Sequence, residues 1–248
     1  MNKIAIAFGI FLFFSPAINA QIFKDLKKQV EKNVPGLSSN SLTEDEVVRG
    51  LKEALDRGIK ETVEVVSRPD GYYLDEMIHI PIPKEANEVE RRMRQLGQGH
   101  LVDEAVRSMN RAAEDAANGA LDIFLDAIRT MSITDAMGLL RGEDDAATRF
   151  LETRTRDTLT QKFEPVIAAS LEKVGATKHW EAVFNTYNKI PLVKKVNPDL
   201  DAYVTEVALN GLFFKLAQEE LNIRENPSAR VTDLLKKVFG GENGEQED

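Results

Sequence analysis

The segment from Asp199 to Leu221 constrains the fold most, because the helix that it predicts is apolar on several faces. Its apolar residues recur at helical spacing and leave no single polar side. They are Leu200, Tyr203, Val204, Val207, Leu209, Leu212, Phe213, Phe214 and Leu216. A helix that is apolar nearly all round belongs at the centre of a bundle, where other helices cover it. The segment therefore predicts an all-α, multi-helix bundle.

Capping and turn residues divide the rest of the chain into further helices. Thr43 with Glu46 and Ser132 with Asp135 have the spacing of residues that cap a helix start. The predicted helices cover residues 22–32, 43–67, 84–96, 101–131, 132–141, 144–174 and 199–221, with one helix around Trp180, Phe184 and Tyr187 and a last one around residues 231–239. We expect a bend near Asn118-Gly119. Proline removes a hydrogen bond from a helix, so Pro165 predicts a kink or a break.

One stretch departs from helical patterning. Arg68-Pro-Asp-Gly71 predicts a turn, since proline sets one dihedral and glycine permits a positive one. Pro81 and Pro83 bias their neighbours away from the helical region, so we expect a short extended segment near residues 78–83. This segment is too short to build a sheet.

The N-terminus has the order of a secretory signal peptide. Lys3 supplies positive charge, residues 4–14 are apolar, and small residues around Ala20 predict cleavage there. A buried N-terminal core helix is the alternative, but Pro16 and the Lys-rich sequence that follows argue against it. The apolar run is too short to cross a bilayer, so we expect no transmembrane helix in the mature protein. The predicted destination is the periplasm or the extracellular space.

The expected organisation follows from these signals. Residues 1–20 are the signal peptide, 21–41 a short amphipathic helix and linker, 42–240 a single helical domain, and 241–248 a disordered acidic tail. The Lys-rich residues 22–32 could contact an anionic membrane surface, or simply pack on the bundle.

Composition excludes several classes of function. The net charge of −9 disfavours nucleic acid as a partner, because an acidic surface repels phosphate. The chain has no cysteine, which excludes disulfides, thiol catalysis and a lipid anchor on cysteine.

The catalytic and metal-binding motifs in the sequence are incomplete. The three histidines are His79, His100 and His179, and the single Glu-x-x-His pair, Glu76 with His79, is half of what a di-iron bundle needs. Ser170-x-x-Lys173 occurs without the Lys-Thr-Gly strand of penicillin-interacting enzymes. We therefore expect no metal and no cofactor.

Three polar groups are candidate ligand-binding sites: Asn110, Arg111 and Glu114; Asp144, Asp145 and Arg149; and Arg224 and Arg230. Each group also has a structural explanation. The first can form an ion pair or a buried polar network, the second can cap a helix, and the third can hydrogen-bond to helix C-terminal carbonyls. For the second group we expect Asp144 or Asp145 to cap the following helix.

The motifs, in order, resemble a family of exported bacterial proteins known only as a domain of unknown function. The resemblance covers about residues 42–240 and implies a signal peptide and a helical domain, with no activity, cofactor or catalytic residue. The blocks that carry it are Leu51–Gly58, Arg68–Tyr73, Ile80–Pro83, Met109–Glu114, Asp144–Phe150, Tyr187-Asn188, Tyr203–Thr205 with Gly211–Phe213, and Asn226–Arg230.

Three functions remain open. The first is a non-enzymatic binding or scaffolding protein of the bacterial envelope, whose partner is an envelope protein or a small ligand. The second is a hydrolase or lyase that uses two of the carboxylates Glu114, Asp144, Asp145 and Glu206. The third is a carrier of lipid or another small hydrophobic ligand, with a pocket lined by Trp180, Phe213 and Phe214. The absence of a catalytic motif favours the first.

Overall fold

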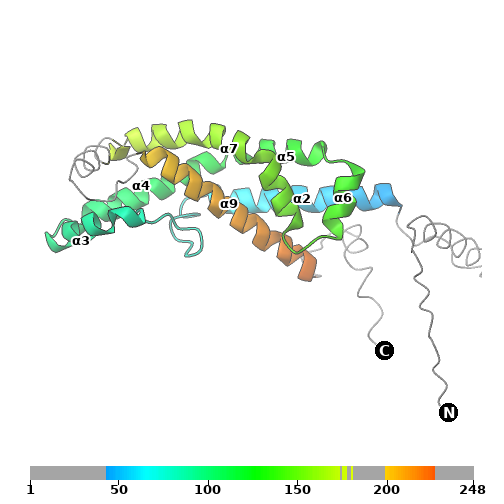
Figure 1. Ribbon diagram of the computed structural model, residues 1–248, viewed down its shortest axis with the longest axis horizontal. Coiled ribbons are helices and arrows are strands. Elements are labelled where there is room, and N and C mark those ends of the chain that lie inside the picture. The colour runs from blue at the N-terminus through cyan, green and yellow to red at the C-terminus, as the bar shows by residue number, and fades with distance from the viewer. Residues whose placement is uncertain (1–42, 174, 178–179, 181–198, 227–248) are drawn as a thin grey trace, which may run out of the picture. The chain divides into compact units, whose positions relative to one another are not determined.

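The all-α prediction is confirmed by a computed structural model that describes residues 43–173, 175–177, 180 and 199–226 (Figure 1). Within these residues six α-helices pack together as a bundle and no strand occurs. The elements are α2 (Glu44–Ser67), the 3-10 helix η1 (Lys84–Ala86), α3 (Asn87–Gln95), α4 (Gly99–Ala117), α5 (Ala120–Arg129), α6 (Ile133–Leu140), α7 (Ala146–Lys173) and α9 (Leu200–Glu225). All described residues belong to one compact unit that begins at Thr43.

Helix α9 takes the central position that its composition predicts. It packs against α2, α4 and α7, and Figure 1 shows it crossing α2. Its buried residues include Leu200, Val204, Leu209, Leu212 and Leu216. Because these side chains lie on more than one side of α9, the main hydrophobic core forms around this helix.

The two predicted capping boxes are present. The Thr43 hydroxyl accepts a hydrogen bond from the Glu46 N–H, and the Glu46 carboxylate accepts one from the Thr43 N–H. Ser132 and Asp135 make the same reciprocal pair at the start of α6. Each pair satisfies N–H groups that have no partner within the helix.

The predicted helix over residues 101–131 is two helices. The bend expected at Asn118-Gly119 is a break between α4 and α5. The Asn118 side-chain amide donates to the carbonyls of Glu114 and Asp115, where it competes for the last acceptors of α4. Ala120, Phe124 and Ile128 of α5 then turn into the core.

Pro165 does not break its helix, and the kink that was the other possibility there stays a prediction. Helix α7 runs without interruption from Ala146 to Lys173 with the proline inside it. The carbonyl of Gln161 loses its helical donor at this point. Because Gln161 and Pro165 are exposed, water can hydrogen-bond to that carbonyl in place of the missing N–H.

Residues 68–83 connect α2 to η1 as one long irregular segment, drawn in teal in Figure 1. The turn expected at its start is confirmed, since the Gly71 N–H donates to the Arg68 carbonyl over 2.9 Å. The left-handed residue is Asp70, with φ of 69°, rather than the glycine. Gly71 is needed for space, because a Cβ there would lie 2.4 Å from the Val65 carbonyl oxygen. Residues 79–83 have no helix or strand, and their extended conformation stays a prediction.

Several predicted segments lie outside the described residues. They are the signal peptide at 1–20, the Lys-rich helix at 22–32, Phe184, Tyr187, the helix at 231–239 and the tail at 241–248. Trp180 is described, and it packs against the main core and beside Ala86.

Candidate functional site

Asn110 fastens one end of the 68–83 segment to α4. Its side chain is fully buried. Oδ1 accepts a hydrogen bond from the Ile80 N–H over 2.9 Å, and Nδ2 donates to the Ile80 carbonyl over 2.9 Å. Buried backbone groups without partners are costly, and Ile80 is itself buried. Asn110 therefore gives Ile80 the two hydrogen bonds that a neighbouring strand would otherwise supply.

Glu114 fastens the other end of the segment. Its Oε1 accepts from the backbone N–H groups of Tyr72 and Tyr73, over 3.1 and 3.2 Å. Its Oε2 accepts from Arg111 over 2.6 Å, and Arg111 also pairs with Asp70 over 2.6 Å. The hydrogen bond from Arg111 to Glu114 helps to raise the pKa of the guanidinium. The left-handed residue Asp70 is thus held by an arginine that the buried carboxylate positions.

Helix α9 holds the segment from a second side. The Tyr72 hydroxyl donates to the Ala208 carbonyl over 2.8 Å, and Lys215 pairs with Asp75 over 2.9 Å. Burial raises the pKa of Tyr72, and the nearby Glu114 charge adds to the rise. The Tyr203 hydroxyl donates to the Pro81 carbonyl over 3.0 Å. The segment is therefore bonded to α4 and α9 along most of its length.

Between these anchors the segment presents large side chains to solvent. Leu74 is 69% exposed and Met77 is 65% exposed. Tyr73 and His79 have ring centroids 5.7 Å apart, and the Arg107 guanidinium carbon lies 5.5 Å from the Tyr73 ring centroid. We call Tyr73, Leu74, Met77, His79 and Arg107 the loop surface. The loop surface thus combines two aromatic rings and one guanidinium with the two apolar side chains, all on backbone that hydrogen bonds hold in place.

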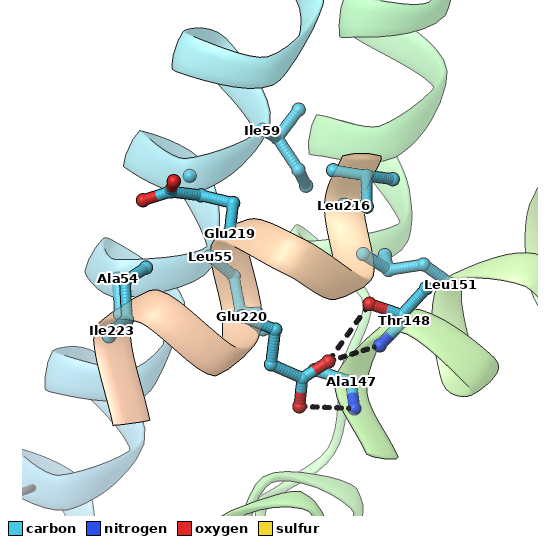
Figure 2. A pocket seen from close by; sticks show the side chains of 11 residues that line it. Ala54, Leu55, Ile59, Ala147, Thr148, Leu151, Leu216, Glu219, Glu220 and Ile223 are labelled. Carbon is cyan, nitrogen blue, oxygen red and sulfur yellow. Dashed lines mark hydrogen bonds between the residues drawn. The ribbon is translucent and has the colours of Figure 1, made fainter. Parts of the chain in front are cut away.

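A second buried carboxylate lies at the start of α7. Glu220 of α9 accepts from the Ala147 N–H over 3.0 Å and from the Thr148 N–H over 2.8 Å, as Figure 2 shows. Arg224 donates to Glu220 over 2.8 Å and to the Leu139 carbonyl near the end of α6 over 2.9 Å. Of the two roles left open for Arg224, the hydrogen bond to a helix C-terminal carbonyl is present, and anion binding stays a prediction.

The expectation that Asp144 or Asp145 caps α7 is wrong. The carboxylate that accepts from the second and third N–H groups of α7, those of Ala147 and Thr148, belongs to Glu220, more than 70 residues further along the chain. Asp145 instead pairs with Arg149 over 2.9 Å in an exposed i, i+4 ion pair, and Asp144 is exposed. An exposed pair of this kind adds only tenths of a kcal/mol, about 0.3–0.5.

The predicted binding residues do not come together at one place. Ser170 donates to Asp115 over 3.2 Å, so the Asn110–Glu114 end of α4 lies beside the C-terminal part of α7. Asp145 and Arg149 lie at the N-terminal end of α7, on the order of 30 Å away at 1.5 Å per residue. Arg230 lies outside the described residues. A ligand-binding role for any of these three predicted groups stays a prediction.

Two pockets within the described residues bear on the catalytic and carrier hypotheses. The pocket in Figure 2 lies where α2, α7 and α9 meet; at about 20 Å³ it has room for one water molecule, and its lining includes Gly58, Leu216 and Glu219. The second, of about 220 Å³, lies between α7 and α9. Its lining residues are Arg156, Thr160, Glu164, Ala202, Thr205, Glu206 and Leu209.

Neither of these two pockets matches the catalytic or carrier hypotheses. Of the four candidate acids, Glu206 alone lines one of them, so no two converge there. Phe213 packs edge-on against Phe124 at 5.8 Å between centroids, and neither it, Phe214 nor Trp180 lines these pockets. In the part of the chain that the structure describes, no three acidic or histidine side chains could hold a metal ion. No described helix is long and apolar enough to cross a membrane.

Sequence reasoning missed the loop surface. Its only signal was a pair of apolar residues, Leu74 and Met77, in a turn-rich stretch that matches neither helix nor strand spacing. The capping role of Glu220 was also not predicted, because Glu219 and Glu220 look like part of an ordinary acidic helix face. Its neighbours in space come from a segment that no local pattern connects to it.

The comparisons with known proteins agree with the resemblance in the sequence. The family model described as "Protein of unknown function (DUF4197)" matches residues 41–240. No curated protein and no solved structure is significantly similar to the chain. Since the match covers most of the chain, the protein belongs to the DUF4197 family of proteins of unknown function.

Proposed function

We propose that this chain is a non-enzymatic binding protein of the bacterial envelope, and that the loop surface contacts a protein partner. One observation carries the proposal: a segment fastened by the buried side chains of Asn110 and Glu114 still exposes Leu74 and Met77 by about two thirds.

Apolar side chains on a fixed loop are well suited to binding. Exposing them costs free energy, because water is ordered or displaced around them. Ordering a flexible loop upon binding costs further free energy, and prior anchoring removes most of that cost. The hydrogen bonds from Tyr72, Tyr73 and Ile80 to α4 side chains supply this anchoring.

The composition and shape of the loop surface favour a protein over a small molecule. Tyrosine, methionine and arginine are enriched where proteins meet, and lysine and acidic residues are depleted. Leu74 and Met77 project into solvent, and neither lines one of the two described pockets. A projecting surface can enter a hollow in another protein, whereas small ligands bind in concave sites.

The acidic residues give less support to an enzyme. Both oxygens of Glu114 accept hydrogen bonds that hold residues 70–73, and both oxygens of Glu220 hold the start of α7. Carboxylates bound in this way stabilise the fold and have little capacity left to take a proton from a substrate. The envelope location rests on the predicted signal peptide, and sequencing the N-terminus of the mature protein tests it.

Site-specific photocrosslinking in cells that express the full chain tests the contact. A photoreactive amino acid is placed at Leu74, at Met77 or at Leu96, the last being a matched control that is 74% exposed near the end of α3. We expect one discrete protein adduct from positions 74 and 77 and none from 96. Adducts from none of the positions, or the same adduct from all three, would overturn the proposal. So would substrate turnover by the purified mature protein that Asp145→Ala abolishes.

A further inference from the structure

Arg107 differs from the other basic residues that hold the 68–83 segment. Arg111 is paired with Asp70 and Glu114, and Lys215 with Asp75. Arg107 makes no ion pair with any described residue, and its guanidinium lies over the Tyr73 ring. It is exposed on α4, in a chain that has nine more acidic than basic residues. No acid among the described residues neutralises this guanidinium, which leaves it available there to another molecule.

The Tyr73 ring affects what Arg107 can bind. A guanidinium that packs its face on an aromatic ring keeps the N–H groups at its edge free for other partners. Those N–H groups match the two oxygens of a carboxylate, which they can bind side by side. Tyr73 is held by Glu114 through its own N–H, and His79 Nδ1 lies 2.8 Å from its carbonyl oxygen. The ring is thus a fixed support, and the guanidinium loses little freedom when an anion binds.

Resting on the function proposed above, we propose that the partner presents an apolar side chain next to a carboxylate. The apolar side chain packs against Leu74 and Met77, and the carboxylate pairs with Arg107. Apolar contact around the pair removes water, which strengthens the attraction between the two charges. The pairing selects a protein partner that is acidic at the contact, against the general tendency of an acidic chain to attract basic partners.

Charge argues against a bilayer as the occupant of this surface. Exposed leucine and methionine could also enter a lipid layer, but bacterial-type anionic headgroups attract clusters of basic residues. Here the exposed Glu76 lies between Leu74 and Met77 and would be brought against the headgroups, whereas Asp75 is paired with Lys215. A protein carboxylate needs only one guanidinium, and Arg107 supplies it.

The test uses the full chain with the photoreactive residue at Met77. Four further substitutions are compared in that background: Arg107→Glu, Arg107→Lys, Glu76→Arg and Arg49→Glu. Arg49 is the matched control, because it is an exposed arginine on α2 with no ion pair among the described residues. We expect Arg107→Glu to lower the yield of the protein adduct about tenfold, Arg107→Lys about threefold or less, and Arg49→Glu not at all.

Glu76→Arg separates binding from a structural role of Arg107. It adds positive charge at an exposed site beside Met77 and leaves Arg107 on Tyr73, so the adduct yield should rise about twofold or more. A loss in Arg107→Glu without that rise would mean that Arg107 only supports the loop, and would overturn the inference. Thermal unfolding of each variant shows which losses come from misfolding.

The remaining outcomes distinguish the two proposals. If Leu74 and Met77 give the adduct but Arg107→Glu leaves its yield unchanged, the carboxylate partner is wrong and the binding function stands. An adduct that proves to be lipid would mean that the surface meets a bilayer, and would also overturn the inference. Absence of any adduct from the chain whose only change is the photoreactive residue at Met77 would remove the binding function itself.

Discussion

Glu220 and Thr148 are joined by two hydrogen bonds, from the Thr148 N–H over 2.8 Å and from its hydroxyl over 2.9 Å. Both residues are buried, and they lie on different helices, α9 and α7. The Glu220 carboxylate on α9 therefore caps the N-terminal end of α7. It also neutralises Arg224, which in turn holds the end of α6.

We predict that Glu220→Ala lowers the free energy of unfolding by about 3 kcal/mol or more, because it leaves buried N–H groups and Arg224 without their acceptor. Urea denaturation followed by circular dichroism measures the loss. Glu219→Gln is the matched control on the next residue. Burial, with repulsion from Glu61 also contributing, raises the pKa of Glu219, so its charge does not favour folding at neutral pH. The control should be as stable as the unsubstituted chain or slightly more so. Equal losses in the two variants would refute the cap.

Asn110→Ala should destabilise the protein by about 2 kcal/mol, since the Ile80 N–H and carbonyl would remain buried without their partner. Hydrogen exchange should speed up most at Ile80 and the residues around it. The exposed Asn118→Ala, just after the C-terminal end of the same helix, serves as the comparison. If exchange at Ile80 does not change, Asn110 does not hold the segment.

Two glycines give opposite predictions for the same substitution. Gly71→Ala places a Cβ within 2.6 Å of the Val66 carbonyl oxygen, and backbone atoms cannot easily move away. We expect a loss of about 2 kcal/mol or more in the free energy of unfolding. In Gly138→Ala the added Cβ has no neighbouring atom within 4 Å, and the residue lies inside α6. This substitution should therefore raise the free energy of unfolding by about 0.5–1 kcal/mol. Thermal unfolding of both variants tests the pair, and a neutral Gly71→Ala would contradict the tight turn.

Thr205 and Thr155 are both buried threonines, yet they should respond differently to valine. The Thr205 hydroxyl has no hydrogen-bond partner among the described residues, whereas the Thr155 hydroxyl donates to the Leu151 carbonyl over 2.7 Å. Thr205→Val removes an unsatisfied polar atom and should stabilise by about 1 kcal/mol. Thr155→Val should give no gain or a small loss. Chemical denaturation of the two variants checks the difference, and a loss in Thr205→Val would show that its hydroxyl is satisfied.

Acid should loosen the 68–83 segment at the Asp75–Lys215 pair. Burial raises the pKa of Asp75, but hydrogen bonds from Lys215 and from the Met77 N–H outweigh it and hold that pKa below its ordinary value. A depressed pKa stabilises the fold above the unfolded value of about 3.9, and this stabilisation is lost as pH falls through the folded value. Lys215→Met should therefore raise the pKa of Asp75, as measured by NMR titration of its carboxyl carbon. Lys60→Met, which removes the partner of Asp56, should leave the Asp75 titration unchanged.

Most of the described helices could be predicted from the sequence by itself, although α4 and α5 were expected as one bent helix. Thr43 with Glu46 and Ser132 with Asp135 act over three residues, and the apolar spacing of residues 199–221 shows that α9 is central before any partner is known. The Arg68–Gly71 turn was predictable for the same reason. These features depend on neighbours within one turn of the chain, where spacing alone decides which groups meet.

Only the tertiary structure decided what the polar residues do. Glu114 meets Tyr72 across 42 residues, and Glu220 meets Thr148 across 72, so no local pattern indicates either contact. The cost of burying an unpaired N–H or carboxylate drives these distant groups together once the bundle has formed. The same packing fastens the 68–83 segment from α4 and α9 and leaves Leu74 and Met77 in solvent. The sequence determined which helices form, and the burial of distant polar groups decided which surface is left to bind another molecule.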